Sequence, residues 1–179
     1  YQKEELIVIG SKPNGGKTCF SLATVLNTIE NKKKVHYFLM SESPEKLISK
    51  LICLKFNLSI KNFELGNYSS INKEEVFAFL ELVSEYLTID YDLFLDIYYI
   101  EQELIVLSCT DPKDLVVIDS LSYIVNDMDE KVDLIKRIKS FSHFSKIPIL
   151  LLVTVDIETD LRNTLNQYKV FSSYTPSIF

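Results

Sequence analysis

Short apolar runs alternate along the chain with longer stretches of helical period. The runs are rich in Ile, Val, Leu, Tyr and Phe and are bounded by polar residues, Gly or Pro, which is typical of buried strands. They predict strands at Leu6–Ile9, Val35–Met40, Leu87–Ile89, Leu115–Ile118 and Pro148–Val155, with Lys169–Ser172 as a candidate sixth. Because the runs are apolar throughout, we expect an α/β fold: a mostly parallel central sheet flanked by helices on both faces.

The stretches between these runs have the spacing of amphipathic helices. They predict helices at Cys19–Ile29, Ser43–Phe56, Asn72–Tyr86, and near Leu93–Leu107 and Lys131–Phe144. Ser43 is a candidate cap with Pro44 in the first helical position, and Asn72 with Glu75 forms a start that is similar to a capping box. The core stripe expected in the last helix is Val132, Leu134, Ile135 and Ile138.

Length and composition narrow the class of protein. At about 150 residues per domain, the 179 residues predict a single domain, 1–179. The hydrophobic fraction of 47% and the charged fraction of 25% exclude a disordered, collagen-like or coiled-coil chain. Every apolar run is shorter than the roughly 18 residues of a membrane span, and no signal-peptide pattern is present, so we expect a cytoplasmic protein without membrane contact. Because Tyr1 stands in place of Met, we expect a fragment of a longer chain.

Charge and reactive side chains exclude other classes of site. The net charge of −6 argues against a surface that is basic throughout, although a local basic groove for nucleic acid remains allowed. Cys19, Cys53 and Cys109 have no metal-ligand or redox spacing, and we expect buried free thiols. His36 and His143 are isolated from one another, and we expect structural roles for both.

The loop after the first strand carries the clearest chemical signal. Residues 11–18 are Ser-Lys-Pro-Asn-Gly-Gly-Lys-Thr and lead directly into a predicted helix. In such a loop backbone amides surround phosphate oxygens, Lys17 lies near the β- and γ-phosphates, and the Thr18 hydroxyl binds Mg²⁺. The strict pattern places Gly where this chain has Ser11, so the loop is a variant, and an ordinary strand–helix turn is the alternative. The expected ATP contacts are Pro13, Asn14, Gly15, Gly16, Lys17, Thr18 and Cys19.

Two carboxylates follow predicted strands. Asp119 ends the run at 115–118, at the edge where open α/β sheets bind ligands, and together with the loop it predicts a carboxylate that holds Mg²⁺ through water. Glu42 follows the second strand and is a candidate catalytic base for the attacking water. The alternative for Glu42 is a solvated residue at the start of the next helix. The two further strand candidates between Lys17 and Asp119 favour a RecA-like P-loop NTPase over a simple nucleotide kinase.

These residues together resemble the C-terminal motor domain of DnaB-type hexameric replicative helicases, over nearly all of the chain. The matching segments are Tyr1–Ile9, Lys12–Thr18 (similar to the family's Arg-Pro-Ser-Met-Gly-Lys-Thr), Tyr37–Leu47 (similar to Phe-Ser-Leu-Glu-Met and the next helix), Lys61–Asn67, Leu87–Asp90 and Asp119. The resemblance implies ATP hydrolysis with Mg²⁺, a homohexameric ring, and movement along single-stranded DNA in replication. It also implies a nucleoid-associated protein, with primase or a helicase loader as candidate partners.

The chain departs from the family pattern at its catalytic positions. Without a gap, the family's catalytic glutamate falls on Ser41, and Glu42 comes one place late, on the opposite face of a strand unless the strand ends early or bulges. Residues 120–122 are Ser-Leu-Ser where the family usually has Tyr-Leu-Gln. Thr154 stands where a polar γ-phosphate sensor, typically Gln, is expected.

The resemblance also extends to candidate coupling residues. Residues 160–162 are Asp-Leu-Arg, similar to a family segment near the DNA-facing loops, so Arg162 and Thr154 are the candidates that couple the site to DNA or to a neighbouring subunit. The connection from Thr154 is shorter than usual, and nothing in the chain matches the family's basic finger. Two alternatives therefore stay open: a nucleotide-binding module with weak or no hydrolysis that serves as a replication-associated scaffold or switch, and a signalling ATPase or kinase of the wider RecA group.

Overall fold

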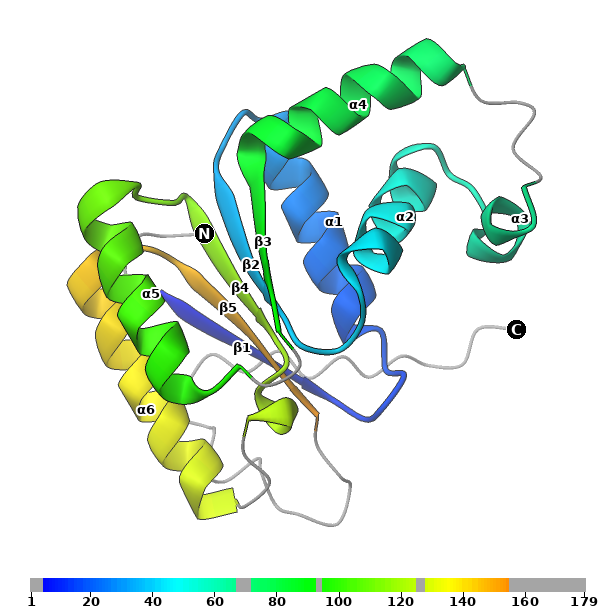
Figure 1. Ribbon diagram of the computed structural model, residues 1–179. Helices are drawn as coiled ribbons and strands as arrows, with labels where there is room; N and C mark the ends of the chain where they lie inside the picture. The colour runs from blue at the N-terminus through cyan, green and yellow to red at the C-terminus, as the bar shows by residue number, and fades with distance from the viewer. Residues whose placement is uncertain (1–4, 67–71, 93–94, 125–127, 155–179) are drawn as a thin grey trace.

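The computed structural model describes residues 5–66, 72–92, 95–124 and 128–154, which form a five-stranded sheet with helices on both faces (Figure 1). All neighbouring strands pair in parallel, in the order β1-β5-β4-β2-β3. The strands are β1 (Leu6–Ser11), β2 (Val35–Leu39), β3 (Leu87–Tyr91), β4 (Leu115–Asp119) and β5 (Ile149–Thr154). The predicted α/β fold is therefore confirmed. The candidate strand at 169–172 lies outside the described residues.

The helices divide between the two faces of the sheet. They are α1 (Lys17–Glu30), α2 (Pro44–Lys55), α3 (Ile60–Glu64), α4 (Lys73–Tyr86), α5 (Ile97–Thr110) and α6 (Met128–Ser145), with a short 3₁₀ turn, η1 (Leu121–Tyr123). Figure 1 shows α1, α2 and α4 over one face and α5 and α6 over the other. Within the part of the chain that the structure describes, no helix is long and apolar enough to span a membrane.

Each central strand contributes side chains to two separate cores, because successive residues of a strand point to opposite faces. On the α1 face, Tyr37 and Val117 pack with Leu22, Val25 and other apolar residues of the helices. On the opposite face, the neighbouring strand positions pack against buried residues of α5 and α6. These are Ile100, Leu104, Leu107, Leu134, Ile135 and Ile138. Burial on both faces explains why the strands are apolar throughout.

The strand order places one strand between the loop that follows β1 and the acidic end of β4. The loop follows β1, Asp119 ends β4, and β5 lies between β1 and β4. This is the order expected of a RecA-like fold, and it confirms that prediction. Parallel strands end at the same edge of the sheet, so the loop, Asp119 and Thr154 share that edge.

The helix starts agree with expectation at Asn72 and differ from it at two other helices. Asn72 does cap α4, accepting a bond from the Glu74 amide at 2.9 Å. Ser43 is the residue before α2, but its side chain makes no capping hydrogen bond. Helix α5 begins at Ile97 rather than near residue 93, since the Asp96 side chain accepts a bond from the Tyr99 amide and caps the helix there.

The unpaired thiols differ from expectation in their burial. Cys53 is buried, whereas Cys19 and Cys109 are exposed, because both lie on helix faces turned away from the sheet. In α6, Val132 is only half-buried, and the stripe that packs on the sheet consists of Leu134, Ile135 and Ile138. These differences do not change the layered architecture.

Candidate active site

The loop between β1 and α1 forms a tight turn that leaves its backbone open to a ligand. Asn14 and Gly16 adopt left-handed conformations, with φ of 60° and 83°, and the Gly15 amide donates to the Lys12 carbonyl at 3.0 Å. Glycine adopts a positive φ without strain, and Asn tolerates it better than most residues do. The two positions therefore explain the residue types that the sequence places there.

Gly15 is required for a different reason, which is close packing inside the loop. A Cβ atom at this position would lie 2.4 Å from Ser11 Oγ, 2.8 Å from Ser11 Cβ and 2.9 Å from the Lys12 carbonyl oxygen. All three distances are shorter than real contacts of a Cβ atom. Ser11, which replaces the usual glycine of this motif, thus occupies space that only a glycine at position 15 leaves free.

The N-terminus of α1 is open to an anion. Gly16 is the residue before the helix, and, within the described part of the chain, no side chain caps the helix and no acidic residue lies in its first turn. Cys19 belongs to that turn and is exposed. The uncapped amides and the positive end of the helix dipole together favour phosphate.

The Lys17 ammonium group lies against the loop backbone. It donates to the Ser11 carbonyl at 3.1 Å, to Ser11 Oγ at 3.2 Å and to the Lys12 carbonyl at 3.1 Å. Burial lowers the pKa of Lys17, and the nearby charge of Asp119 opposes that shift. These contacts position a cation at the centre of the loop.

Asp119 links the acidic end of β4 to the first turn of α1. Its Oδ2 accepts a hydrogen bond from Thr18 Oγ1 at 3.1 Å and a second from the Tyr37 hydroxyl at 2.9 Å. Asp119 lies on the α1 face because Leu115 and Val117, at alternate positions of the same strand, also pack there. The structure thus brings together two of the predicted residues, Thr18 and Asp119, which are 101 positions apart in the sequence.

The carboxyl group of Asp119 is almost entirely out of water, with 2% of the residue exposed. Burial raises its pKa, while the bonds from Tyr37 and Thr18 and the charge of Lys17 oppose the shift; the charge of Glu42 adds to it. Burial also raises the pKa of Tyr37 well above 10, so the phenol stays protonated and donates a hydrogen bond to Asp119. A cation at this carboxylate would offset the cost of burying its charge.

Glu42 lies beside this group, although it comes one position late in the sequence. Strand β2 ends at Leu39, so strict alternation no longer sets the face of Glu42. Its Oε2 pairs with the Lys50 ammonium group of α2, a helix on the α1 face. Its Oε1 is buried and, among the described residues, has no hydrogen-bond partner. The early end of the strand therefore brings Glu42 to the same side of the sheet as Asp119.

Thr154 occupies the end of β5 between the two halves of the site. It pairs in register with Ser11 of β1, and its amide donates to Ser122 Oγ at 3.0 Å. The candidate sensor position is thus tied both to the loop and to the turn after Asp119. Arg162, the other candidate for coupling, lies outside the described residues.

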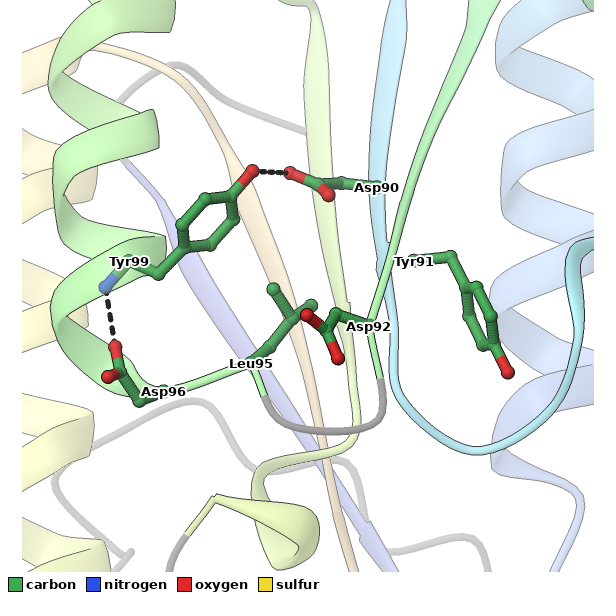
Figure 2. Close-up of a pocket in the computed structure, with 6 residues that line it drawn as sticks. All are labelled: Asp90, Tyr91, Asp92, Leu95, Asp96 and Tyr99. Carbon is green, nitrogen blue, oxygen red and sulfur yellow. Dashed lines mark hydrogen bonds between the residues drawn. The ribbon is translucent and has the colours of Figure 1, made fainter.

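A hollow of about 330 Å³ lies at the end of β3, the edge strand opposite β1. Figure 2 shows the Tyr99 hydroxyl directed at Asp90, with which it forms a hydrogen bond of 2.7 Å, and Tyr91 on the other side of the strand. The lining residues are Asp90, Tyr91, Asp92, Leu95, Asp96 and Tyr99. Three carboxylates repel phosphate, so this hollow does not fit the nucleotide.

The residues around Asp119 fit a magnesium–nucleotide complex better than a metal held by protein alone. Among the described residues, no group of three His, Cys, Asp or Glu side chains could hold a metal ion. Mg²⁺ is commonly bound by one or two protein oxygens together with phosphate and water. A hydroxyl and a carboxylate in contact beside an uncapped helix N-terminus, with a loop that a Cβ at residue 15 would fill, meet that requirement.

Three further residues of the site were not predicted from the sequence. Ser21 and Tyr37 extend the hydrogen-bond network of Asp119, and Lys50 holds Glu42. Ser21 could have been found from the sequence, because its hydroxyl lies three positions after Thr18 and therefore on the same helix face. Tyr37 is one of several aromatic residues in apolar runs, so its role required the strand pairing.

The comparisons with known proteins agree with this geometry. Residues 1–166 match the family described as the DnaB-like helicase C-terminal domain. Two curated relatives are the replicative DNA helicase DnaC of Bacillus subtilis (strain 168), 28% identical over 68 residues, and the replicative DNA helicase DnaB of Geobacillus stearothermophilus, 27% identical over 67 residues. Each match covers 37% of this chain and 15% of the relative.

Solved structures show the same fold. A DnaB-like replicative helicase, described with its interactions with primase, superposes with a TM-score of 0.73 at 18% identity, covering 88% of this chain and 41% of that chain. A second solved structure, described as an ATPase domain, superposes with a TM-score of 0.72 at 18% identity, covering 92% of this chain and 62% of that chain. The chain thus spans less than two thirds of each of these relatives.

Proposed function

Because this chain belongs to the DnaB-like helicase C-terminal domain family, we propose that it is an ATP-dependent motor domain of a DNA helicase that acts in replication. The observation that carries the proposal is the 3.1 Å contact between Thr18 Oγ1 and Asp119 Oδ2. It joins the phosphate-binding loop to the acidic strand end across the sheet. Both halves of a nucleotide site therefore lie together.

The residues of the loop bind the triphosphate in this proposal. Pro13, Asn14, Gly15 and Gly16 shape the turn, the amides up to Cys19 face the phosphates, and Lys17 neutralises the β- and γ-phosphate oxygens. Thr18 and Asp119 hold Mg²⁺, the latter through water. When bound, Mg²⁺ neutralises the charge that develops on the phosphates.

Glu42 acts as the catalytic base in this proposal. Its Oε1, which is buried and has no partner among the residues that the structure describes, accepts a hydrogen bond from the attacking water and receives its proton, while Oε2 stays paired with Lys50. Thr154 and Arg162 couple the site to DNA or to a neighbouring subunit. Large exposed apolar side chains, such as Phe20 (51%) and Phe77 (67%), support contacts with another protein surface.

The family and its relatives support further elements of the proposal. We infer a homo-oligomer, hexameric as the resemblance implies, that binds single-stranded DNA in the cytoplasm at the nucleoid. Primase is a candidate partner because one structural relative is described with primase, and a helicase loader is another. Each match covers only 15% of the curated relative, so the activity, substrate and partners of the whole protein are part of this proposal.

The test measures ATP hydrolysis by the protein with and without single-stranded DNA. Wild-type protein should hydrolyse ATP faster when DNA is added, and Lys17→Ala should lose nucleotide binding and turnover. Lys12→Ala is the matched control, because Lys12 contributes its carbonyl rather than its ammonium group to the loop contacts. A hexamer whose turnover does not respond to single-stranded DNA would contradict the motor function.

The Glu42–Lys50 ion pair favours one second candidate. A carboxylate held in an ion pair is less free to turn toward the attacking water, so the chain would bind ATP with weak or no hydrolysis and act as a scaffold or switch in replication. Tight Mg·ATP binding without turnover, in the presence and absence of DNA, is the expected result for that candidate. Turnover that is strongly stimulated by single-stranded DNA excludes it.

A further inference from the structure

Two hydroxyl side chains join Asp119 to α1 by a second route, in addition to Thr18. The Tyr37 hydroxyl lies 2.9 Å from Asp119 Oδ2 and 2.9 Å from Ser21 Oγ. Tyr37 and Ser21 are each 0% exposed, so water does not compete for these bonds. The four side chains form a closed group between β2, β4 and α1.

The hydrogen atoms of this group have a defined direction. An ionised carboxylate only accepts, so the single phenol hydrogen of Tyr37 points to Asp119 Oδ2. The phenol oxygen then accepts from Ser21, whose hydroxyl also lies 2.9 Å from the Thr18 carbonyl oxygen. Ser21 shares its hydrogen between the two acceptors. Both Thr18 and Ser21 lie on one face of α1, one turn apart.

Among the described residues, the hydrogen bonds to the Asp119 carboxyl group converge on Oδ2, which leaves Oδ1 for a metal-bound water. Oδ2 accepts from both Thr18 and Tyr37, and two donors to the same oxygen fix the plane of the carboxyl group. With Thr18 alone, Asp119 could rotate about its side-chain bonds while keeping that contact. The phenol removes this freedom, because β2 and β4 are adjacent strands and Tyr37 is held in the sheet.

We propose that Tyr37, supported by Ser21, is a positioning residue for magnesium: it orients the Asp119 carboxylate so that Mg²⁺ binds together with the nucleotide. The inference rests on the proposed nucleotide site and deepens it. Neither Tyr37 nor Ser21 touches the metal or the nucleotide. Their effect is confined to the step in which the ion binds, and binding of metal-free nucleotide depends on the loop alone.

The test compares affinity for a fluorescent ADP analogue in EDTA with affinity across a Mg²⁺ titration. Tyr37→Phe keeps the ring and removes one hydroxyl. It should raise the Mg²⁺ concentration for half-maximal tightening by roughly tenfold, the size expected for one hydrogen bond to a charged group. Affinity in EDTA should stay unchanged. Ser21→Ala should raise the same Mg²⁺ concentration by roughly threefold, because a bond between neutral groups contributes less.

Tyr99→Phe is the matched control. Its hydroxyl also donates to an aspartate, Asp90, at 2.7 Å, but it lies at the hollow beyond the far edge strand (Figure 2). It should leave the Mg²⁺ titration unchanged. A merely structural role of Tyr37 would lower the melting temperature and weaken binding equally in EDTA and in Mg²⁺, and that result overturns the proposal.

The outcomes separate this inference from the proposed function. Wild-type protein that shows no nucleotide binding in either condition overturns both. Wild-type binding that Mg²⁺ tightens, with Tyr37→Phe responding as the wild type does, overturns the positioning role alone. If Tyr37→Phe does not fold, Ser21→Ala carries the test, and an unchanged Mg²⁺ titration in that variant overturns the proposal.

Discussion

The acidic side chains of the candidate site, Asp119 and Glu42, are wholly or partly buried. Asp119 is 2% exposed, and one carboxyl oxygen of Glu42 is buried without a hydrogen-bond partner in the described part of the chain. A buried charge is costly unless donors or an opposite charge compensate it. Thr18 and Tyr37 do so for Asp119, and Lys50 does so for Glu42. The Glu42 oxygen that has no partner in the described part of the chain is the one that the proposed function assigns to the attacking water.

Glu42→Gln tests that assignment. Glutamine keeps the shape but does not accept a proton, so turnover of ATP should fall by roughly 10²- to 10⁴-fold while Mg·ATP binding is retained. Steady-state hydrolysis and nucleotide affinity are the measurements. Glu45→Gln is the control, since Glu45 lies three residues later in the exposed first turn of α2. Equal loss in both variants would contradict a role specific to Glu42.

His36 predicts a dependence of stability on pH. It lies in β2 with 3% exposed, and both ring nitrogens lack hydrogen-bond partners among the described residues. Burial lowers its pKa to about 4, with Asp90 opposing the shift. The unfolded chain binds a proton near pH 6.5 and the folded chain only near pH 4, so stability falls as the pH decreases between these values, by up to about 3 kcal/mol.

The measurement is urea denaturation at pH 7 and pH 4.5. The wild type should lose stability over this range, and His36→Leu should lose less because it removes the group that takes up the proton on unfolding. His143→Leu is the control, because His143 is exposed in the last turn of α6. A pH dependence that is the same in His36→Leu and in the wild type would refute the assignment.

The loop between β1 and α1 shows how residue types depend on one another within an element. Gly15→Ala places a Cβ 2.4 Å from Ser11 Oγ and 2.9 Å from the Lys12 carbonyl oxygen, so the loop must shift. Because the loop amides that the proposed function assigns to phosphate shift with it, nucleotide affinity should fall by roughly tenfold or more, as for loss of one or two hydrogen bonds to charged groups. Equilibrium binding of the nucleotide measures the change.

Ser11→Gly in the same chain should restore part of the affinity, since it removes the two contacts to Ser11 and leaves the one to Lys12. Gly66→Ala is the matched control: Gly66 has a φ of 76° and open space around it. That substitution should reduce stability through backbone strain without changing nucleotide affinity. No recovery in the Ser11→Gly, Gly15→Ala double variant would contradict the packing argument.

Sequence pattern predicted the elements better than it predicted their ends. The strands followed from apolar runs, but β1 extends to Ser11 and β4 to Asp119 because Ser11 pairs with Thr154 and Asp119 with Leu39. Polar residues at those ends gave no strand signal. Helix α3 was missed because it has five residues and none of them is buried.

The candidate site shows the same limit. Lys17, Thr18 and Asp119 were predicted because motif spacing and position in the elements identify them. Tyr37 was missed because its partner belongs to a strand that is adjacent in space and 82 residues away. The assignment of roles to these residues stays a prediction, and Arg162 lies outside the described residues.

At the scale of the whole molecule, nucleotide binding should stabilise the fold. A ligand at 100 times its dissociation constant adds about 2.7 kcal/mol, which for a chain of this size raises the melting temperature by roughly 5–11 °C. A thermal melt with and without a saturating Mg·ATP analogue measures the shift. Lys17→Ala should abolish most of it, and an equal shift in that variant would show that the ligand binds elsewhere.

The place of β5 between β1 and β4 has a mechanical consequence. The carboxyl ends of β1 and β4, from which the loop and Asp119 extend, are two strand spacings apart, about 10 Å, and backbone ladders on both sides of β5 lock that separation. Separating the two would break the ladders, so the sheet works as a stiff frame during a reaction cycle. If the proposed motor function holds, movement has to come from parts of the protein outside this sheet, because the spacing of its strands is fixed.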